Sequence, residues 1–284
     1  MTTILSIQSS VAYGHVGNSA ATFPLMRMGV EVLPVLTVHF SNHTGYGAWR
    51  GPLLAADDVA QVILGIDERD VLGTVDAVLS GYQGAEEMGR EILRAVELVK
   101  QRNPAAIYCC DPVMGDVGRG MYVRPGIPEF MRDHVVPKAQ IVTPNQFELD
   151  FLTGRTTTTL AETLAAAHAL RAVGPEVVVV TSAVIEDAPE DSLAMLAVTG
   201  EGAWQVLTPR LPRTFTGSGD LTAATFLAHY LRTGDAAAAL GVTADVVFSV
   251  LEVTTRSGKA ELQLVAAQDE LVVPSHHFEV TRLA

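Results

Sequence analysis

The chain has 284 residues, of which 48% are hydrophobic and 18% are charged, and its formal net charge is −13. This much apolar sequence can form the core of one large α/β domain or of two small ones. The acidic balance, without any basic block, argues against a nucleic-acid or anionic-membrane surface, because nothing would neutralise the phosphates.

The N-terminus and the cysteines bear on the cellular compartment. The first residues carry no basic region and lead directly into a strand pattern, so we expect no signal peptide. The sequence has no run of about 18 consecutive apolar residues, so we also expect no membrane-spanning segment. The two cysteines, Cys109 and Cys110, are neighbours and cannot link distant segments, which excludes a disulfide framework. Together these features predict a cytoplasmic protein with reduced thiols.

Short apolar runs alternate along the chain with helical patterns. The runs are rich in Val and Ile, and several lack polar alternation, as expected of strands that are buried on both faces. The predicted strands are Ile4–Gln8, Val32–Val38, Ala77–Leu79, Ala106–Cys110, Ile141–Val142 and Val177–Val180, followed by a hairpin of Leu193–Val198 and Trp204–Thr208. The predicted helices are Glu86–Gln101, Leu160–Val173, Leu221–Leu231 and Asp235–Thr255.

This order of elements predicts an α/β fold. We expect a three-layer, doubly wound and mostly parallel sheet, with helices on both faces and the antiparallel hairpin added to one edge. No linker or internal repeat divides the sequence, so we expect residues 1–284 to form one domain. In open parallel sheets, ligands bind beyond the carboxyl ends of the strands. Polar residues that follow the strands are therefore the candidates for a functional site.

The segments after the first three strands could line a pocket for a small molecule. Ser9 ends the first strand, and residues 13–18 follow as a turn, which could approach a ligand closely or could be an ordinary capped βα turn. His43 and Thr44 lie in a loop of aromatic and hydrogen-bonding side chains, which suits a flat heteroaromatic ligand, the alternative being a plain surface loop. Tyr82 could stack on a ring or could simply close the edge of the core.

Carboxylates follow a buried central strand. Asp111 has no partner in a sheet and needs a cation, a metal or water. Asp116 comes shortly after it, and the glycine-rich residues 118–120 make the segment resemble a mobile lid. The alternative is a proline-containing turn with a solvated Asp.

Two further strand ends carry polar residues. Asn145 and Glu148 have the spacing of a helix capping box, and Glu148 could in addition hold a water molecule of a Mg²⁺ shell. Both roles are compatible with one helix start. Thr181 and Ser182 end the next strand, where their hydroxyl groups could contact a phosphate or a monovalent ion.

A glycine-rich turn precedes the predicted helix Leu221–Leu231. Gly217 and Gly219 flank Ser218, and Asp220 follows. Such a turn directs unpaired N–H groups to one point at the positive end of a helix, where an anion can bind. An Asp beside that point is a candidate base for a hydroxyl group that attacks a phosphate. Glycine-rich turns before helices are common, so this interpretation depends on the other segments.

Taken together, these segments resemble the pyridoxal kinases of the ribokinase-like superfamily. The resemblance runs from about Ile4 to the C-terminus, and its N-terminal and Asn-His-Thr blocks are specific to pyridoxal kinases. The matching blocks are Ser6–Ser9, Gly14–Ala20, Phe40–Tyr46, Ser80–Tyr82, Asp111–Gly115, Thr143–Glu148, Gly217–Asp220 and Glu261–Val265.

The resemblance implies ATP-dependent phosphorylation of the 5′-hydroxymethyl group of pyridoxal, pyridoxine or pyridoxamine by a homodimer. It implies that Asp220 is the catalytic base and that the turn Gly217, Ser218, Gly219 and Asp220 is the anion hole. The implied vitamer pocket consists of Ser9, His43, Thr44, Tyr82 and Asp220.

The resemblance also assigns the nucleotide and cation side. The implied ATP-binding residues are Asp111, Thr143, Asn145, Glu148, Thr181, Ser182, Gly217 and Gly219. Asp116 and Glu148 would serve Mg²⁺, while Asp111, Thr143 and Thr181 would serve a monovalent cation, K⁺. Residues Gly115–Tyr122 resemble a flap, and Pro209–Phe215, on the adenine side, is short compared with several members. The alternatives are a hydroxymethylpyrimidine kinase of the same fold and a vitamer-binding protein without turnover.

Overall fold

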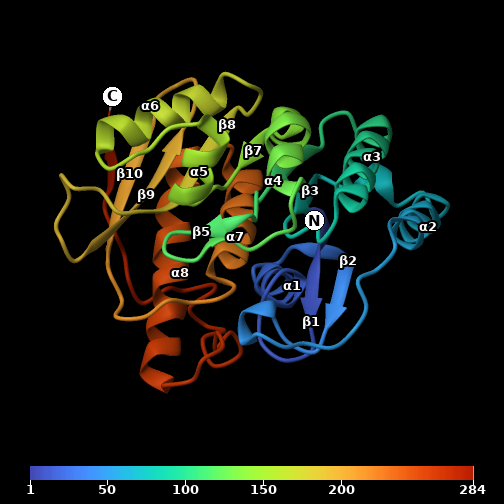
Figure 1. Ribbon diagram of the computed structural model, residues 1–284, viewed down its shortest axis with the longest axis horizontal. Coiled ribbons are helices and arrows are strands. Elements are labelled where there is room, and N and C mark those ends of the chain that lie inside the picture. The colour runs from blue at the N-terminus through green and yellow to red at the C-terminus, as the bar shows by residue number, and fades with distance from the viewer. Residues whose placement is uncertain (284) are drawn as a thin grey trace.

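Nine strands of the chain form one mixed sheet in the computed structural model, which describes residues 1–283 (Figure 1). The strand order is β11-β10-β9-β8-β7-β4-β3-β1-β2. Neighbours from β8 to β2 pair in parallel, whereas β9, β10 and β11 pair antiparallel. The strands are β1 (Thr3–Val11), β2 (Glu31–Phe40), β3 (Ala77–Ser80), β4 (Ile107–Cys110), β7 (Ile141–Val142), β8 (Val177–Ala183), β9 (Ser192–Val198), β10 (Ala203–Pro209) and β11 (Val280–Arg282).

Helices cover both faces of this sheet, so the predicted three-layer fold is confirmed. On one face α1, α7 and α8 pack together and against the sheet, and on the other face lie α2, α3, α5 and α6. The helices are α1 (Asn18–Arg27), α2 (Ala56–Asp67), α3 (Glu86–Arg102), α4 (Ile127–Phe130), α5 (Gln146–Thr153), α6 (Leu160–Arg171), α7 (Ser218–Thr233) and α8 (Ala236–Ser257). Shorter helical turns are Thr44–Tyr46, Leu72–Thr74, Met131–Val135 and Val136–Lys138.

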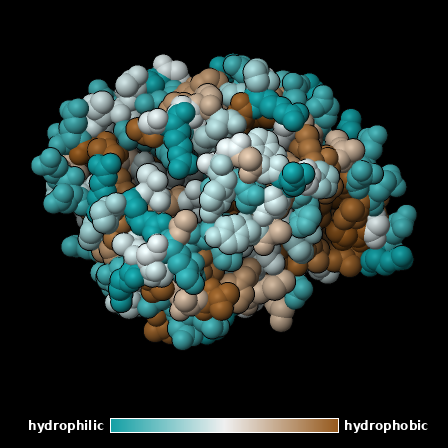
Figure 2. Space-filling model, turned by 60° about the horizontal axis from the view of Figure 1, so that its bottom comes forward, coloured by the Kyte–Doolittle hydropathy of each residue, from teal (hydrophilic) through white to brown (hydrophobic). Residues whose placement is uncertain are grey.

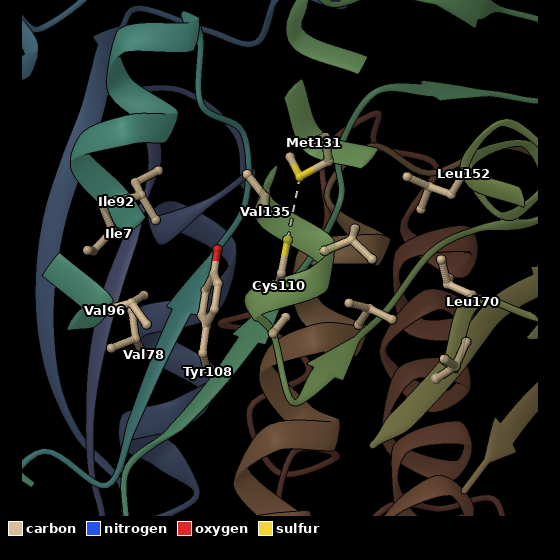
Figure 3. Close-up of a cluster of buried hydrophobic side chains, with 14 of the residues drawn as sticks. Ile7, Val78, Ile92, Val96, Tyr108, Cys110, Met131, Val135, Leu152 and Leu170 are labelled. Carbon is tan, nitrogen blue, oxygen red and sulfur yellow. Dashed lines mark hydrogen bonds between the residues drawn. The ribbon is translucent and has the colours of Figure 1, made fainter. Parts of the chain in front are cut away.

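Two large apolar clusters hold the layers together. One lies between the sheet and the α2–α6 layer, and Figure 3 shows Ile7, Ile92 and Tyr108 inside it. There the thiol of Cys110 donates to the sulfur of Met131 at 3.7 Å, which places this cysteine in the core. The other cluster lies between the sheet and α1, α7 and α8. Because both faces of the sheet are covered, its central strands are buried throughout, as their unbroken apolar runs predicted.

The antiparallel edge was predicted in part. The hairpin of β9 and β10 is confirmed, with Ala203 opposite Val198. The pairing of β11 with β10 was not predicted, because three residues near the C-terminus carry no clear strand pattern by themselves. Helix α8 is long and apolar enough to cross a membrane by length and composition, but most of it is buried inside the fold, as is usual for a core helix.

Candidate active site

The turn before α7 has the geometry of an anion site. Gly217 has φ +88° and stands just before the helix, whose first residue is Ser218. A Cβ atom on Gly217 would overlap the carbonyl oxygen of His15, so a side chain is excluded by space as well as by backbone conformation. The first N–H groups of a helix have no acceptor within the helix and lie at its positive end. The turn can therefore receive a phosphate.

Asp220 lies in the first turn of α7 and meets the loop after β1. The Asp220 carboxylate lies near the N–H group of Gly17 and near its own N–H group, and both lower its pKa. Ser9 packs directly against Gly17, where a Cβ atom would overlap the Ser9 hydroxyl oxygen. The structure thus brings Ser9 to the same corner of the sheet as Asp220, as expected for strand-end residues.

Asp111 approaches the anion turn from the end of β4. It is 5% exposed, and its Oδ2 atom lies 3.8 Å from the position that a Cβ atom on Gly219 would take. The hydroxyl of the buried Thr143 donates to Asp111 Oδ1 at 3.2 Å. The structure therefore brings Asp111, Thr143 and Gly219 together.

Glu148 belongs to the capping box of α5 and also holds the start of the flap. The Asn145 side chain accepts from the Glu148 N–H group, while Glu148 Oε2 accepts from the Asn145 N–H group at 3.0 Å. Glu148 Oε1 accepts from the N–H group of Met114 at 2.9 Å, and Asn145 Nδ2 donates to the carbonyl of Gly115 at 2.9 Å. The predicted cap is confirmed, and the same pair of side chains fastens the segment that leads into the flap.

The segment that the resemblance predicts to be a flap forms a small hairpin. Its strands are β5 (Gly115–Asp116) and β6 (Gly120–Met121), which pair antiparallel, and β5 lies against α5 (Figure 1). Asp116 Oδ1 accepts the N–H group of Val117 at 2.8 Å, which leaves its other oxygen without a protein donor in the described structure.

Burial and mutual repulsion govern the charge of the three central carboxylates. Desolvation by burial raises the pKa of Asp111, and the negative charges of Glu148 and Asp220 raise it further. Burial raises the pKa of Glu148 to about 8, against the lowering effect of its backbone N–H donors. Burial likewise raises the pKa of Asp220 to about 6, opposed by the N–H groups of Gly17 and of Asp220 itself. The site thus disfavours the charged forms of these carboxylates, and a bound cation would stabilise them.

No lysine or arginine forms an ion pair with these three carboxylates within residues 1–283. Nor do three or more His, Cys, Asp or Glu side chains in that range form a group that could hold a metal ion. A site with few carboxylate ligands suits a cation that keeps most of its water and phosphate ligands, which is how Mg²⁺ is usually bound.

Among the predicted vitamer residues, Tyr82 packs against a small apolar cluster. Tyr82 is half-buried against Val11, Val16 and the β2 residues Val38 and Phe40. Its pKa is raised, mainly by desolvation.

The loop after β2 holds the remaining vitamer residues. Thr44 is exposed, and His43 is half-buried. Within residues 1–283, no hydrogen bond joins the side chain of Thr44 to Ser9 or to Tyr82. Thr181 and Ser182 are half-buried in β8, and Thr181 is tied to the Thr143 segment because its N–H group donates to the carbonyl of Pro144 at 3.0 Å.

Two residues that lie in matching segments, but to which the sequence assigned no individual role, also belong here. Tyr122 is 47% exposed, and its pKa is raised first by desolvation and then by the charges of Glu148, Asp111 and Asp220. Glu261 is buried and contacts both vitamer-side loops. An acidic residue directly before an apolar run was the available signal for Glu261, and an aromatic residue in a glycine-rich flap was the signal for Tyr122.

A mostly parallel αβα sheet, with an anion-binding turn beside a carboxylate at one sheet edge, defines the ribokinase-like class of small-molecule kinases. The family described as "Phosphomethylpyrimidine kinase" matches residues 75–264. The chain is 59% identical to a pyridoxal kinase of Leifsonia xyli over 99% of both chains. It is also 59% identical to one of Rubrobacter xylanophilus, over 99% of this chain and 97% of that one.

Solved structures agree with these matches. Pyridoxal kinase from Leishmania donovani in complex with ADP and pyridoxamine superimposes with a TM-score of 0.93 and 30% identity, over 100% of both chains. Pyridoxal kinase from Trypanosoma brucei gives a TM-score of 0.88 and 29% identity over 99% of both chains. The chain belongs to the pyridoxal kinase family.

Proposed function

We propose that this chain transfers the γ-phosphoryl group of ATP to the 5′-hydroxymethyl group of pyridoxal and of the related vitamers pyridoxine and pyridoxamine. The observation that carries the proposal is the placement of the Asp220 carboxylate at the turn that forms the anion site, beside Ser9 and Gly17. The relatives named pyridoxal kinase match over the whole chain, including the loops on the vitamer side.

In this proposal, Asp220 accepts the proton of the attacking hydroxyl group. With its pKa raised to about 6, Asp220 is ionised at neutral pH and is more basic than an exposed Asp. The N–H groups at the start of α7 stabilise the charge of the transferred phosphoryl group. Phosphoryl transfer depends mainly on positioning and charge stabilisation, so these two contributions suffice without a covalent intermediate.

We assign the cations to the carboxylate side of the turn. Mg²⁺ would be held by Asp116 and, through a water molecule, by Glu148, and it would neutralise phosphate oxygens of ATP. Both Glu148 oxygens already accept N–H groups, but each keeps a lone pair for water. K⁺ would lie near Asp111, Thr143 and Thr181. The three buried carboxylates support both assignments, because their raised pKa values show that their charged forms have no cation beside them in the described structure.

We assign the remaining residues to the two substrates. Ser9, His43, Thr44 and Tyr82 would contact the vitamer, and Asn145 and Ser182 would contact ATP. Support for the vitamer side comes from the apolar wall around Tyr82, which suits a flat ring.

The test is an assay of the purified chain with Mg²⁺, K⁺ and ATP against each vitamer, with the 5′-phosphate measured by chromatography. Formation of the phosphate supports the proposal, and its absence for all three vitamers refutes it. Binding of pyridoxal without any consumption of ATP would instead indicate a vitamer-binding protein.

A hydroxymethylpyrimidine kinase is the second candidate, because the matching family profile bears a phosphomethylpyrimidine name. That match starts at residue 75 and so omits Ser9, His43 and Thr44, whereas the pyridoxal kinase relatives match these segments too. We therefore expect pyridoxal to outcompete hydroxymethylpyrimidine when both are present at equal concentration.

We also propose that the protein is a cytoplasmic homodimer. Helix α2 leaves Val62 and Leu64 exposed, at 51% and 46%. Hydrophobic residues gather on the right of Figure 2, the side on which α2 lies in Figure 1. Such apolar surface supports self-association. Sedimentation velocity of the purified chain tests the dimer, and fractionation of cells that express it tests the compartment.

A further inference from the structure

Glu261 contacts the loop after β1 and the loop after β2, which also meet directly through backbone hydrogen bonds and the rings of Tyr13 and Tyr46. It lies just after α8, and its side chain is 9% exposed. Its Oε1 atom accepts the hydroxyl of Tyr46 at 2.6 Å and lies 3.3 Å from His43 Nε2. Its Oε2 atom accepts the N–H group of His15 at 3.3 Å. One carboxylate therefore holds the loop after β1 and the loop after β2.

The first of these loops continues to the catalytic turn. The carbonyl oxygen of His15 packs against Gly217, and the N–H group of Gly17 lies near the Asp220 carboxylate and lowers its pKa. The carboxylate of Glu261 lies so close to the backbone of Gly14 that a Cβ atom there would overlap it. A shift of Glu261 would thus move the segment that orients Asp220.

The backbone before Glu261 is anchored separately. The guanidinium of Arg213 donates to the carbonyl oxygens of Lys259 and Ala260 at 2.8 and 3.0 Å. It also lies over the ring of Phe215, 5.0 Å from its centre, in the segment that leads to the anion turn. The backbone that carries Glu261 is therefore held in place, and the position of its carboxylate sets the positions of the two loops.

Burying a carboxylate is costly unless donors satisfy it, and a neutral residue could fill this space at lower cost. The donors here are a phenol, a backbone N–H group and an imidazole, all from segments on the vitamer side. No arginine or lysine in the described structure pairs with this carboxylate. The negative charge of Glu261 is therefore stabilised by donors from the two loops.

We propose that Glu261 is a positioning residue that locks residues 13–17 and 43–46 against each other. Through this lock it sets the vitamer side of the site and the loop that orients Asp220. The inference rests on the proposed kinase function, with pyridoxal as the substrate whose binding depends on the lock.

The test compares Glu261→Gln with the wild-type full chain. Glutamine keeps the shape and one acceptor oxygen but removes the charge, and hydrogen bonds to charged groups are the stronger ones. We expect KM for pyridoxal to rise roughly tenfold or more and kcat to fall, while KM for ATP and the Kd of ADP stay within about twofold. Glu252→Gln is the matched control: Glu252 also pairs with a histidine, His276, but remotely on α8, so its kinetics should be unchanged.

A second variant protects the test against a general loss of structure. Tyr46→Phe removes one donor to Glu261, and its effect on pyridoxal KM should overlap with that of Glu261→Gln in the double variant. If the two single-variant increases in pyridoxal KM multiply in the double variant, the inference is overturned. Unchanged pyridoxal kinetics in Glu261→Gln, or an equal loss of affinity for pyridoxal and for ATP, would also overturn it. If wild type itself forms no phosphate, the proposed function fails instead, and calorimetric pyridoxal binding to both variants still decides the role of Glu261.

Discussion

Replacing Asp220 with Asn is expected to abolish turnover and to stabilise the fold. The buried Asp220 carboxylate has its pKa raised from 3.8 to about 6, so the folded state disfavours its charge. A rise of about two pH units corresponds to roughly 3 kcal/mol. This cost is complete above pH 6 and disappears below the unfolded pKa of 3.8, because the proton is then bound in both states. Asn has nearly the same shape as Asp, so the replacement removes the charge and fills the same space.

Urea unfolding measures this effect directly. At pH 8 we expect Asp220→Asn to unfold with a free energy up to roughly 3 kcal/mol above wild type, and at pH 5 with about half that gain. Asp133→Asn is the control, because its carboxylate has a lowered pKa beside Arg132 and its loss should destabilise slightly. Equal or negative changes for Asp220→Asn at both pH values would refute the role of burial, and near-normal kcat would refute Asp220 as the base.

Three further results are expected. Gly217→Ala should destabilise the fold by about 1–3 kcal/mol and reduce kcat sharply. Gly234→Ala is the control, because Gly234 has φ +68° but open space around it, and this variant should lose less stability and keep kcat. Urea unfolding and steady-state kinetics measure both effects. Asn145→Ala and Thr159→Ala each remove the side chain of a capping box and should each cost about 1 kcal/mol of stability. Only Asn145→Ala should also raise KM for ATP, because the Asn145 side chain donates to the carbonyl of Gly115 in the predicted flap. Equal KM values for the two variants would contradict this. The rate constant kcat/KM should fall on the acid side with a midpoint near pH 6, where Asp220 gains its proton, and a flat profile down to pH 5 would speak against that assignment.

Local sequence signals predicted most of the fold. Apolar runs located the parallel strands, and the spacing of Asn145 with Glu148 identified a capping box that the structure confirms. Such signals work because strand burial and helix caps depend on residues a few positions apart. The rule that ligands bind at the carboxyl ends of strands then selected Ser9, Asp111 and Thr143 as neighbours of the turn at Gly217.

The sequence by itself therefore determined the elements, their order and the edge at which polar residues gather. Only the tertiary structure decided which of these residues lie together: Asp111 accepts the hydroxyl of Thr143, whereas Thr44 stays exposed. Glu261 is the clearest case, because its partners Tyr46 and His15 lie 215 and 246 positions away in the chain. No local pattern encodes such a contact, since it forms only when the packing of α8 against the sheet brings the C-terminal segment over the vitamer-side loops.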